Sequence, residues 1–169
     1  MSDLVISKAS ENDMPQIMAI YEHARQFMKE TGNATQWKDN YPPQALLWSD
    51  IAAGQLYIVK GDDCIHGVFV FFIGEDDTYK VIKDGSWMDD TEYGVIHRVA
   101  SDGKIKGMVG TVVEYCSGSI SHLRIDTHND NKVMQRALEK CGFRKCGIIH
   151  IADGSPRIAY ERVYKEVDI

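Results

Sequence analysis

One stretch constrains the fold more than any other: residues 93–116 hold a strand pattern, a glycine-rich turn and a helical pattern in direct succession. The apolar residues after the turn recur at helical spacing, at Val109, Val112, Val113 and Cys116. The turn itself, residues 101–110, contains Gly103, Gly107 and Gly110. Glycines let backbone N–H groups approach an anion closely, and a helix N-terminus supplies partial positive charge. The stretch therefore predicts an anion-binding loop between a strand and a helix.

The negative net charge of the chain makes the cationic residues in and near this turn important. At -6, the charge argues against non-specific binding to nucleic acid, which needs a basic face. An anionic ligand must then be held by a local group of cations. Lys104 and Lys106, with Arg98 close before them in the sequence, form such a group.

The remainder of the chain predicts a sheet covered by helices. Residues 68–73 are apolar on both faces, which is typical of a central strand. Residues 75–91 are polar and predict an irregular connection with one short helical turn. The other predicted elements are a strand at 4–6, helices at 14–31 and 43–53, a hairpin at 56–73, a strand at 123–127, a helix at 131–141, and strands at 143–151 and 157–164.

This order predicts an α/β or α+β fold, with a mixed, mostly antiparallel sheet of about seven strands flanked by about four helices. We expect a single domain over residues 1–169. No apolar run approaches the roughly 18 residues that span a bilayer, and the first residues lack the layout of a signal peptide. We therefore expect a cytoplasmic protein with no membrane partner.

Two sets of side chains could bind metal, and neither predicts a metal site. The four cysteines form no Cys-x-x-Cys pair, lie in apolar segments and are expected to be core thiols. Asp126 and His128 have the same-face spacing of ligands on a strand, with His122 and Asp130 close by. Such short polar clusters are usually solvated turns.

The element order and two motifs resemble the GNAT superfamily of acyl-CoA-dependent N-acetyltransferases. The family's pyrophosphate loop, Gln/Arg-x-x-Gly-x-Gly/Ala, falls on residues 104–109, where Gly107 matches and Lys104 replaces Gln or Arg. Val109 stands where the family has a small residue. The second motif is an Asn that begins a helix running to a Gly-Phe pair, and it falls on Asn131 and residues 142–143. The resemblance covers essentially the whole chain.

The resemblance implies acetyl-CoA as the cofactor. Backbone N–H groups of residues 105–110 would bind its pyrophosphate. Val99 would present backbone to the pantetheine arm, which in the family lies where the fourth and fifth strands splay apart, and Asn131 and Met134 would contact that arm from the other side. The implied cofactor contacts are Val99, Lys104, Ile105, Lys106, Gly107, Met108, Val109, Gly110, Asn131 and Met134.

The same resemblance implies an N-acetyltransferase that transfers the acetyl group to a primary amine by direct attack in a ternary complex. An ammonium acceptor must first lose a proton, and His97, on the strand where the family often has a carboxylate, is the predicted base. The family's tyrosine, which protonates the leaving thiolate, is replaced by Leu138. Cys141, Tyr160 and His128 are alternative donors. Because leucine carries no proton, the alternative function is a non-catalytic acyl-CoA-binding or sensing module of the same fold.

The acceptor is the least determined part of the prediction. Tyr21, Trp37 and Tyr41 are candidate substrate contacts, and they suit an amine of a small molecule or of a protein or peptide equally. Trp37 and Tyr41 could instead anchor their loop on the core. A homodimer is left open as the assembly.

Overall fold

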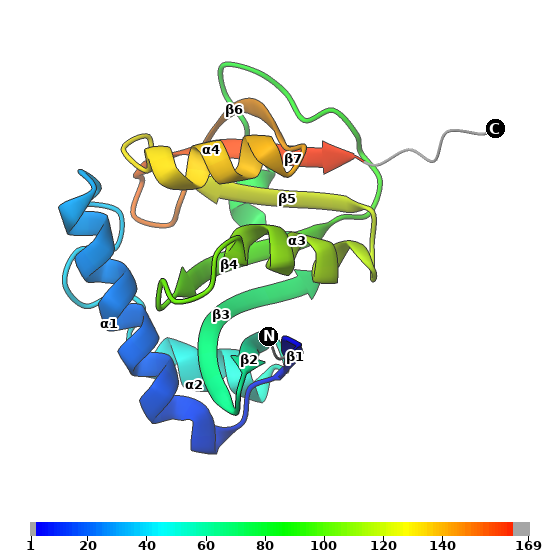
Figure 1. Ribbon diagram of the computed structural model, residues 1–169. Coiled ribbons are helices and arrows are strands. Elements are labelled where there is room, and N and C mark those ends of the chain that lie inside the picture. The colour runs from blue at the N-terminus through cyan, green and yellow to red at the C-terminus, as the bar shows by residue number, and fades with distance from the viewer. Residues whose placement is uncertain (1–2, 164–169) are drawn as a thin grey trace. The chain divides into compact units, whose positions relative to one another are not determined.

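A mixed sheet of seven strands organises the chain, in the order β1-β2-β3-β4-β5-β7-β6 (Figure 1). The structure, a computed structural model, describes residues 3–163. It divides into two compact units, one formed by residues 3–71 and 97–108 and the other by residues 72–96 and 109–163. Strands β3 and β4 contribute residues to both units.

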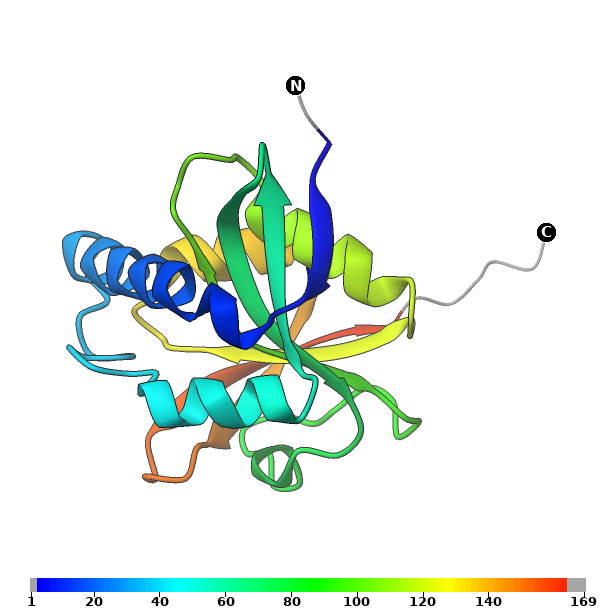
Figure 2. The same ribbon diagram turned by 90° about the horizontal axis from the view of Figure 1, so that it is seen from below.

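The first unit holds an antiparallel set of strands with two helices beside it (Figure 2). Its elements are β1 (Val5–Lys8), a 3-10 turn (Glu11–Asp13), α1 (Met14–Glu30), α2 (Gln44–Ala52), β2 (Leu56–Gly61), most of β3 (Cys64–Ile73) and the end of β4 (Gly94–Ser101). Val5 of β1 lies opposite Lys60 of β2, and Leu56 of β2 lies opposite Val70 of β3.

Helical periodicity explains the core of this unit. Ile17 and Tyr21 of α1 are four residues apart, share one face, and are fully buried. Leu47 of α2 and Phe69 of β3 are fully buried as well. Gly32, with φ +85°, follows the last turn of α1 in the left-handed conformation that commonly ends helices.

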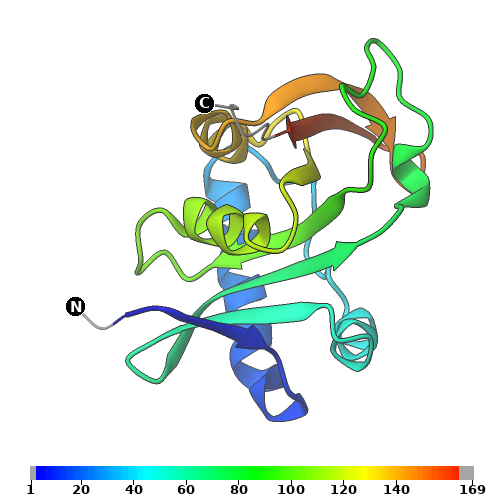
Figure 3. The same ribbon diagram turned by 90° about the vertical axis from the view of Figure 1, so that its right-hand side faces the viewer.

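The second unit combines both kinds of strand pairing. Its elements are the end of β3, a 3-10 turn (Asp77–Tyr79), the start of β4, α3 (Met108–Ser117) apart from its first residue, β5 (His122–Thr127), α4 (Lys132–Lys140), β6 (Arg144–His150) and β7 (Pro156–Val163). Gly94 of β4 pairs in parallel with Leu123 of β5, and Leu123 lies opposite Arg162 of antiparallel β7. Figure 3 shows α3 and α4 on one side of these strands and the connection from residue 74 to 93 on the other.

The predicted elements are confirmed, from the central position of β3 to the short helical turn inside the 75–91 connection. The predicted end of the last strand, Tyr164, lies outside the described residues. The expectation that all four cysteines are core thiols is confirmed only for Cys116. Cys141 and Cys146 are partly buried, and Cys64 is exposed because β3 begins there, next to the hairpin turn. None of the helices among residues 3–163 is both long and apolar enough to span a membrane. The single-domain organisation stays a prediction.

Candidate active site

The strand β4 carries a strained residue just before the predicted pantetheine contact. Arg98 has φ +49°, a left-handed conformation that non-glycine residues rarely adopt. Its carbonyl accepts a hydrogen bond from the Tyr21 hydroxyl at 2.9 Å, and its Nη2 donates to Asp50 Oδ2 at 2.6 Å. Both ends of Arg98 are therefore held by the two helices of the first unit, which keeps the turned peptide in place.

Burial and the pairing with Asp50 determine the protonation states at Arg98 and at its neighbour Tyr21. Burial acts to lower the pKa of the Arg98 guanidinium, but the Asp50 carboxylate together with the Tyr41 and Tyr21 hydroxyls outweighs it, and the pKa is raised. Burial holds the pKa of the Tyr21 hydroxyl far above its ordinary value, so Tyr21 is neutral and acts as a donor. His97 and Val99, on either side of Arg98, are partly buried in β4. Their roles as base and backbone contact stay predictions.

The predicted pyrophosphate loop begins with two backbone N–H groups that the loop's own side chains satisfy. The Gly103 N–H donates to Ser101 Oγ, and the Lys104 N–H donates to Asp102 Oδ1, both at 3.0 Å. These two N–H groups are therefore used within the loop itself. The binding role of residues 105–110, which the resemblance implies, stays a prediction.

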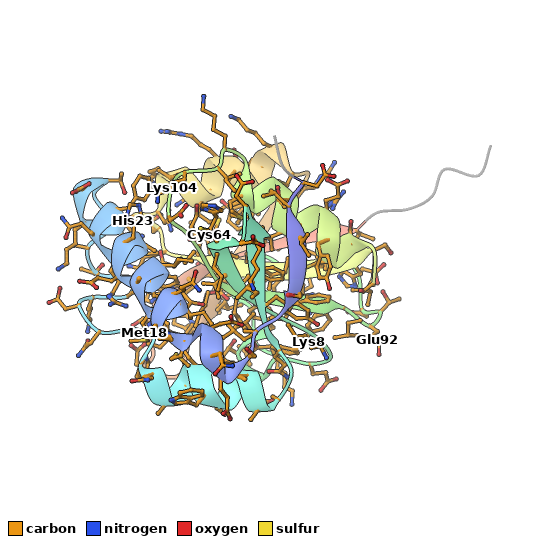
Figure 4. All side chains as sticks on the ribbon, turned by 60° about the horizontal axis from the view of Figure 1, so that its bottom comes forward. Lys8, Met18, His23, Cys64, Glu92 and Lys104 are labelled. Carbon is orange, nitrogen blue, oxygen red and sulfur yellow. The ribbon has the colours of Figure 1, made fainter. Side chains whose placement is uncertain are left out.

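Glycine and lysine give the loop its chemical character. Gly103 and Gly107 have φ +77° and +74°, and a Cβ on Gly107 would meet no atom within 4 Å. Lys104 and Lys106 are exposed, and Figure 4 shows Lys104 on the same side of the first unit as His23 of α1. The first N–H groups of α3, which starts at Met108, have no partner inside the helix. The loop thus presents cations and main-chain donors, and space beside Gly107, as a pyrophosphate group requires.

The second motif lies in the second unit. Asn131 caps α4, and its Oδ1 accepts a hydrogen bond from the Met134 N–H at 3.0 Å. Leu138, at the position of the family's tyrosine, is fully buried in this unit. The helix has the predicted start and end, with Gly142 at φ +88° after it.

The alternative acids differ in protonation. Burial raises the pKa of the Cys141 thiol and of the Tyr160 hydroxyl, so both carry a proton at neutral pH. Burial lowers the pKa of His128, which favours its neutral form and makes it a poor acid. None of the three is assigned a catalytic role by the geometry.

The three predicted substrate contacts form one aromatic group in the first unit. The Trp37 ring lies 5.6 Å from the Tyr21 ring and 6.3 Å from the Tyr41 ring, measured between centroids. Tyr21 is fully buried and Trp37 is 8% exposed, so both pack the loop onto the core. Tyr41 is 38% exposed and is the member of the group with a ring open to solvent. Substrate contact stays a prediction for all three.

A buried charged cluster in the second unit was missed. Glu161 of β7 is fully buried and accepts hydrogen bonds from His122 Nε2 at 2.6 Å and Arg124 Nε at 2.8 Å. The Arg124 guanidinium lies 4.1 Å from the Trp87 ring and 4.0 Å from the Tyr93 ring. Glu161 also accepts from the Met88 N–H at 2.6 Å, so the cluster fixes the 74–93 connection to β5 and β7.

This cluster corrects the view of His122 and Asp126 as part of a solvated turn. His122 pairs with Glu161, and Asp126 accepts a hydrogen bond from the Tyr79 hydroxyl at 2.7 Å. Residues 122, 124 and 126 share one face of β5, and that alternation was the available signal. Within residues 3–163, no three His, Cys, Asp or Glu side chains are placed to hold a metal ion.

Comparison with known proteins identifies solved structures that are similar to the chain. No protein-family model matches the sequence, and no curated protein matches it significantly. A solved acetyltransferase of the GNAT family from Streptococcus agalactiae matches over 96% of both chains, with 29% sequence identity and a TM-score of 0.84. The chain therefore has the fold of the GNAT acetyltransferases and is similar to a member of that family over nearly its whole length.

More distant GNAT structures share the fold. An acetyltransferase of the GNAT family from Listeria monocytogenes is 16% identical over 94% of both chains, with a TM-score of 0.68. A ribosomal-protein-alanine N-acetyltransferase from Brucella melitensis is 13% identical over 95% of this chain and 99% of its own, with a TM-score of 0.61. These structures show the shared fold, and the similarity to the Streptococcus agalactiae enzyme supports acetyl transfer in general. The acceptor is not among the features that these comparisons identify.

Proposed function

We propose that this protein transfers the acetyl group of acetyl-CoA to a primary amine of a small molecule or a protein, by direct attack in a ternary complex. The observation that carries the proposal is the loop at residues 101–110. The N–H groups of Gly103 and Lys104 are satisfied by side chains of the loop, space is open beside Gly107, and Lys104 and Lys106 are exposed. In a chain of net charge -6, such a local group of donors and cations is what an anionic cofactor requires.

Each part of the proposed site has a distinct role in binding or in acetyl transfer. Acetyl-CoA, when bound, supplies the acetyl thioester. The backbone from Ile105 to Gly110, with Lys104 and Lys106, holds the pyrophosphate. The backbone N–H of Val99 stabilises the oxyanion that develops on the attacked carbonyl. His97 accepts the proton of the ammonium acceptor. Asn131 and Met134 are proposed contacts of the pantetheine arm from the resemblance alone.

The first test is binding. Calorimetric titration with acetyl-CoA should show saturable binding to the wild-type protein, and its absence in well-folded protein would overturn the proposal. Gly107→Glu introduces a negative charge and a side chain at φ +74°, and should weaken binding by at least about 100-fold. The matched control is Gly154→Glu, because Gly154 has φ +84°, equally open space, and a place in the β6–β7 turn. Equal losses of acetyl-CoA affinity in the two variants would count against the loop as the binding site.

The second test separates the enzyme from the non-catalytic alternative, which the buried Leu138 favours. A thiol has an unperturbed pKa near 8.5, so a coenzyme A thiolate can leave without a dedicated acid. General acid help is typically worth about 10²–10⁴-fold, so turnover should be slow but measurable. Thiol release with a panel of small amines and peptides above the protein-free rate would exclude a pure binding module. Binding without any turnover across the panel would favour it.

A further inference from the structure

The hairpin of β2 and β3 contacts the pyrophosphate loop at three places, all within the first unit. His66 lies 2.7 Å from Asp102, measured from Nδ1 to Oδ2. Gly67 lies against the Met108 side chain, and Gly61 lies near the end of the Ile105 side chain. Figure 3 shows the loop at the same end of this unit's strands as the hairpin turn. The hairpin therefore forms the support on which the loop rests.

Asp102 uses its two carboxylate oxygens for different purposes. Oδ2 accepts from His66 Nδ1, while Oδ1 accepts from the Lys104 N–H at 3.0 Å. The Asp102 N–H in turn donates to the His66 carbonyl at 3.0 Å. The two side chains are 14% and 17% exposed, so solvent screens their contact only weakly. Holding Asp102 in this orientation keeps the Lys104 N–H bonded within the loop, and so fixes the conformation in which the loop begins.

One glycine of the hairpin allows the loop to lie close. A Cβ on Gly67 would be 2.5 Å from Met108 Sδ, closer than such atoms can approach, whereas a Cβ on Gly61 would make only ordinary contact with Ile105 at 3.6 Å. Met108 is the first residue of α3 and is 5% exposed. A side chain at position 67 would displace Met108 and, with it, the start of the helix that supplies the N–H groups.

We propose that His66, through Asp102, and Gly67, through Met108, are positioning residues that set the affinity of the loop for acetyl-CoA. Neither residue belongs to the loop or to the family's two motifs. The inference rests on the proposed function, because it assigns the loop's ligand as acetyl-CoA. A loop already fixed in its binding shape loses less conformational entropy on binding, so its supports act on affinity and leave the chemical step alone.

The test compares two substitutions at His66 with one elsewhere. His66→Ala removes the donor to Asp102, and the affinity for acetyl-CoA should fall about tenfold with a matching rise in KM and an unchanged kcat. His66→Asn should restore most of the affinity, because the Asn Nδ2 replaces the imidazole Nδ1 as a donor. His150→Ala, at an exposed histidine on β6, is the matched control and should leave binding unchanged.

A second variant keeps the inference testable if His66→Ala folds poorly. Gly67→Ala leaves the His66–Asp102 contact intact and acts only through Met108, whose flexible side chain absorbs part of the clash. We expect a smaller loss of affinity, about threefold, again without a change in kcat.

The outcomes separate the two proposals. If the wild-type protein does not bind acetyl-CoA, the proposed function fails and this inference fails with it. If the wild type binds, and His66→Ala and Gly67→Ala bind equally well, the function stands and the positioning role is overturned. A fall in kcat or thermal stability at unchanged KM would also overturn it, since that result indicates a merely structural role.

Discussion

Two polar connections, one before β4 and one after it, differ in how their polar groups are used. The connection at residues 74–93 directs its groups inward, where the Met88 N–H and the Trp87 ring contact a fully buried charged cluster around Glu161. The loop at residues 102–107 instead exposes its two cationic side chains, Lys104 and Lys106, to solvent. Both segments are polar in sequence, so polarity alone does not distinguish a connection that stabilises the fold from a loop that binds a ligand. The two are distinguished by whether their polar side chains are paired inside the protein or exposed to solvent.

The largest expected effect comes from a substitution in the buried cluster that holds the connection at residues 74–93. Glu161→Ala leaves Arg124 and His122 buried without their carboxylate, and should lower the free energy of unfolding by about 3–5 kcal/mol. Urea denaturation followed by tryptophan fluorescence measures it. Glu114→Ala removes an exposed carboxylate from α3 and should change stability by no more than about 0.5 kcal/mol. A similar small change for Glu161→Ala would mean that the cluster does not hold the connection.

The same cluster predicts how stability depends on pH. Burial acts to raise the pKa of the Glu161 carboxyl, but hydrogen bonds from His122, Met88 and Arg124 outweigh it and lower the pKa below 4.5. A carboxyl whose folded-state pKa is lowered contributes stability above its unfolded pKa and loses it as the pH falls through the folded value. The free energy of unfolding should therefore fall below about pH 5, and less steeply in Glu161→Gln than in the wild type. Equal slopes in the two proteins would assign the acid sensitivity to other carboxylates.

The smallest expected effect concerns the two exposed lysines of the loop at residues 102–107. Lys104→Ala and Lys106→Ala each remove an exposed cation from the loop, and each should weaken acetyl-CoA binding by about 1 kcal/mol, or about fivefold. The loss should shrink at high salt, because exposed charges are screened, and stability should not change. Calorimetry at two salt concentrations measures it, with Lys145→Ala on β6 as the control. A loss of stability without a loss of affinity would make these lysines structural.

Local patterns were sufficient to predict the elements and the loop. The change of period between residues 93–100 and 109–116, with glycines between them, identified the strand, the turn and the helix that the structure contains. Glycines also predicted the ends of the helices, as at Gly142. These features depend on neighbours within a few residues, so a single sequence contains the information.

The supports of the loop could not be predicted in this way. His66 and Asp102 are 36 residues apart, and their contact depends on where β3 lies relative to the end of β4. The cluster around Glu161 was missed for a related reason, since charged residues on a strand usually face solvent. Only the fold shows that the 74–93 connection covers that face of β5.

Arg98 has a consequence for any attempt to redesign this protein. The backbone at position 98, with φ +49°, favours glycine, whereas Asp50 requires a cationic side chain there. No residue type meets both demands without strain, so the amino acid at this position is set by a compromise. Randomising position 98 alone should yield few functional variants, while libraries that vary positions 21, 50 and 98 together can reach other solutions, because the three residues form one coupled unit.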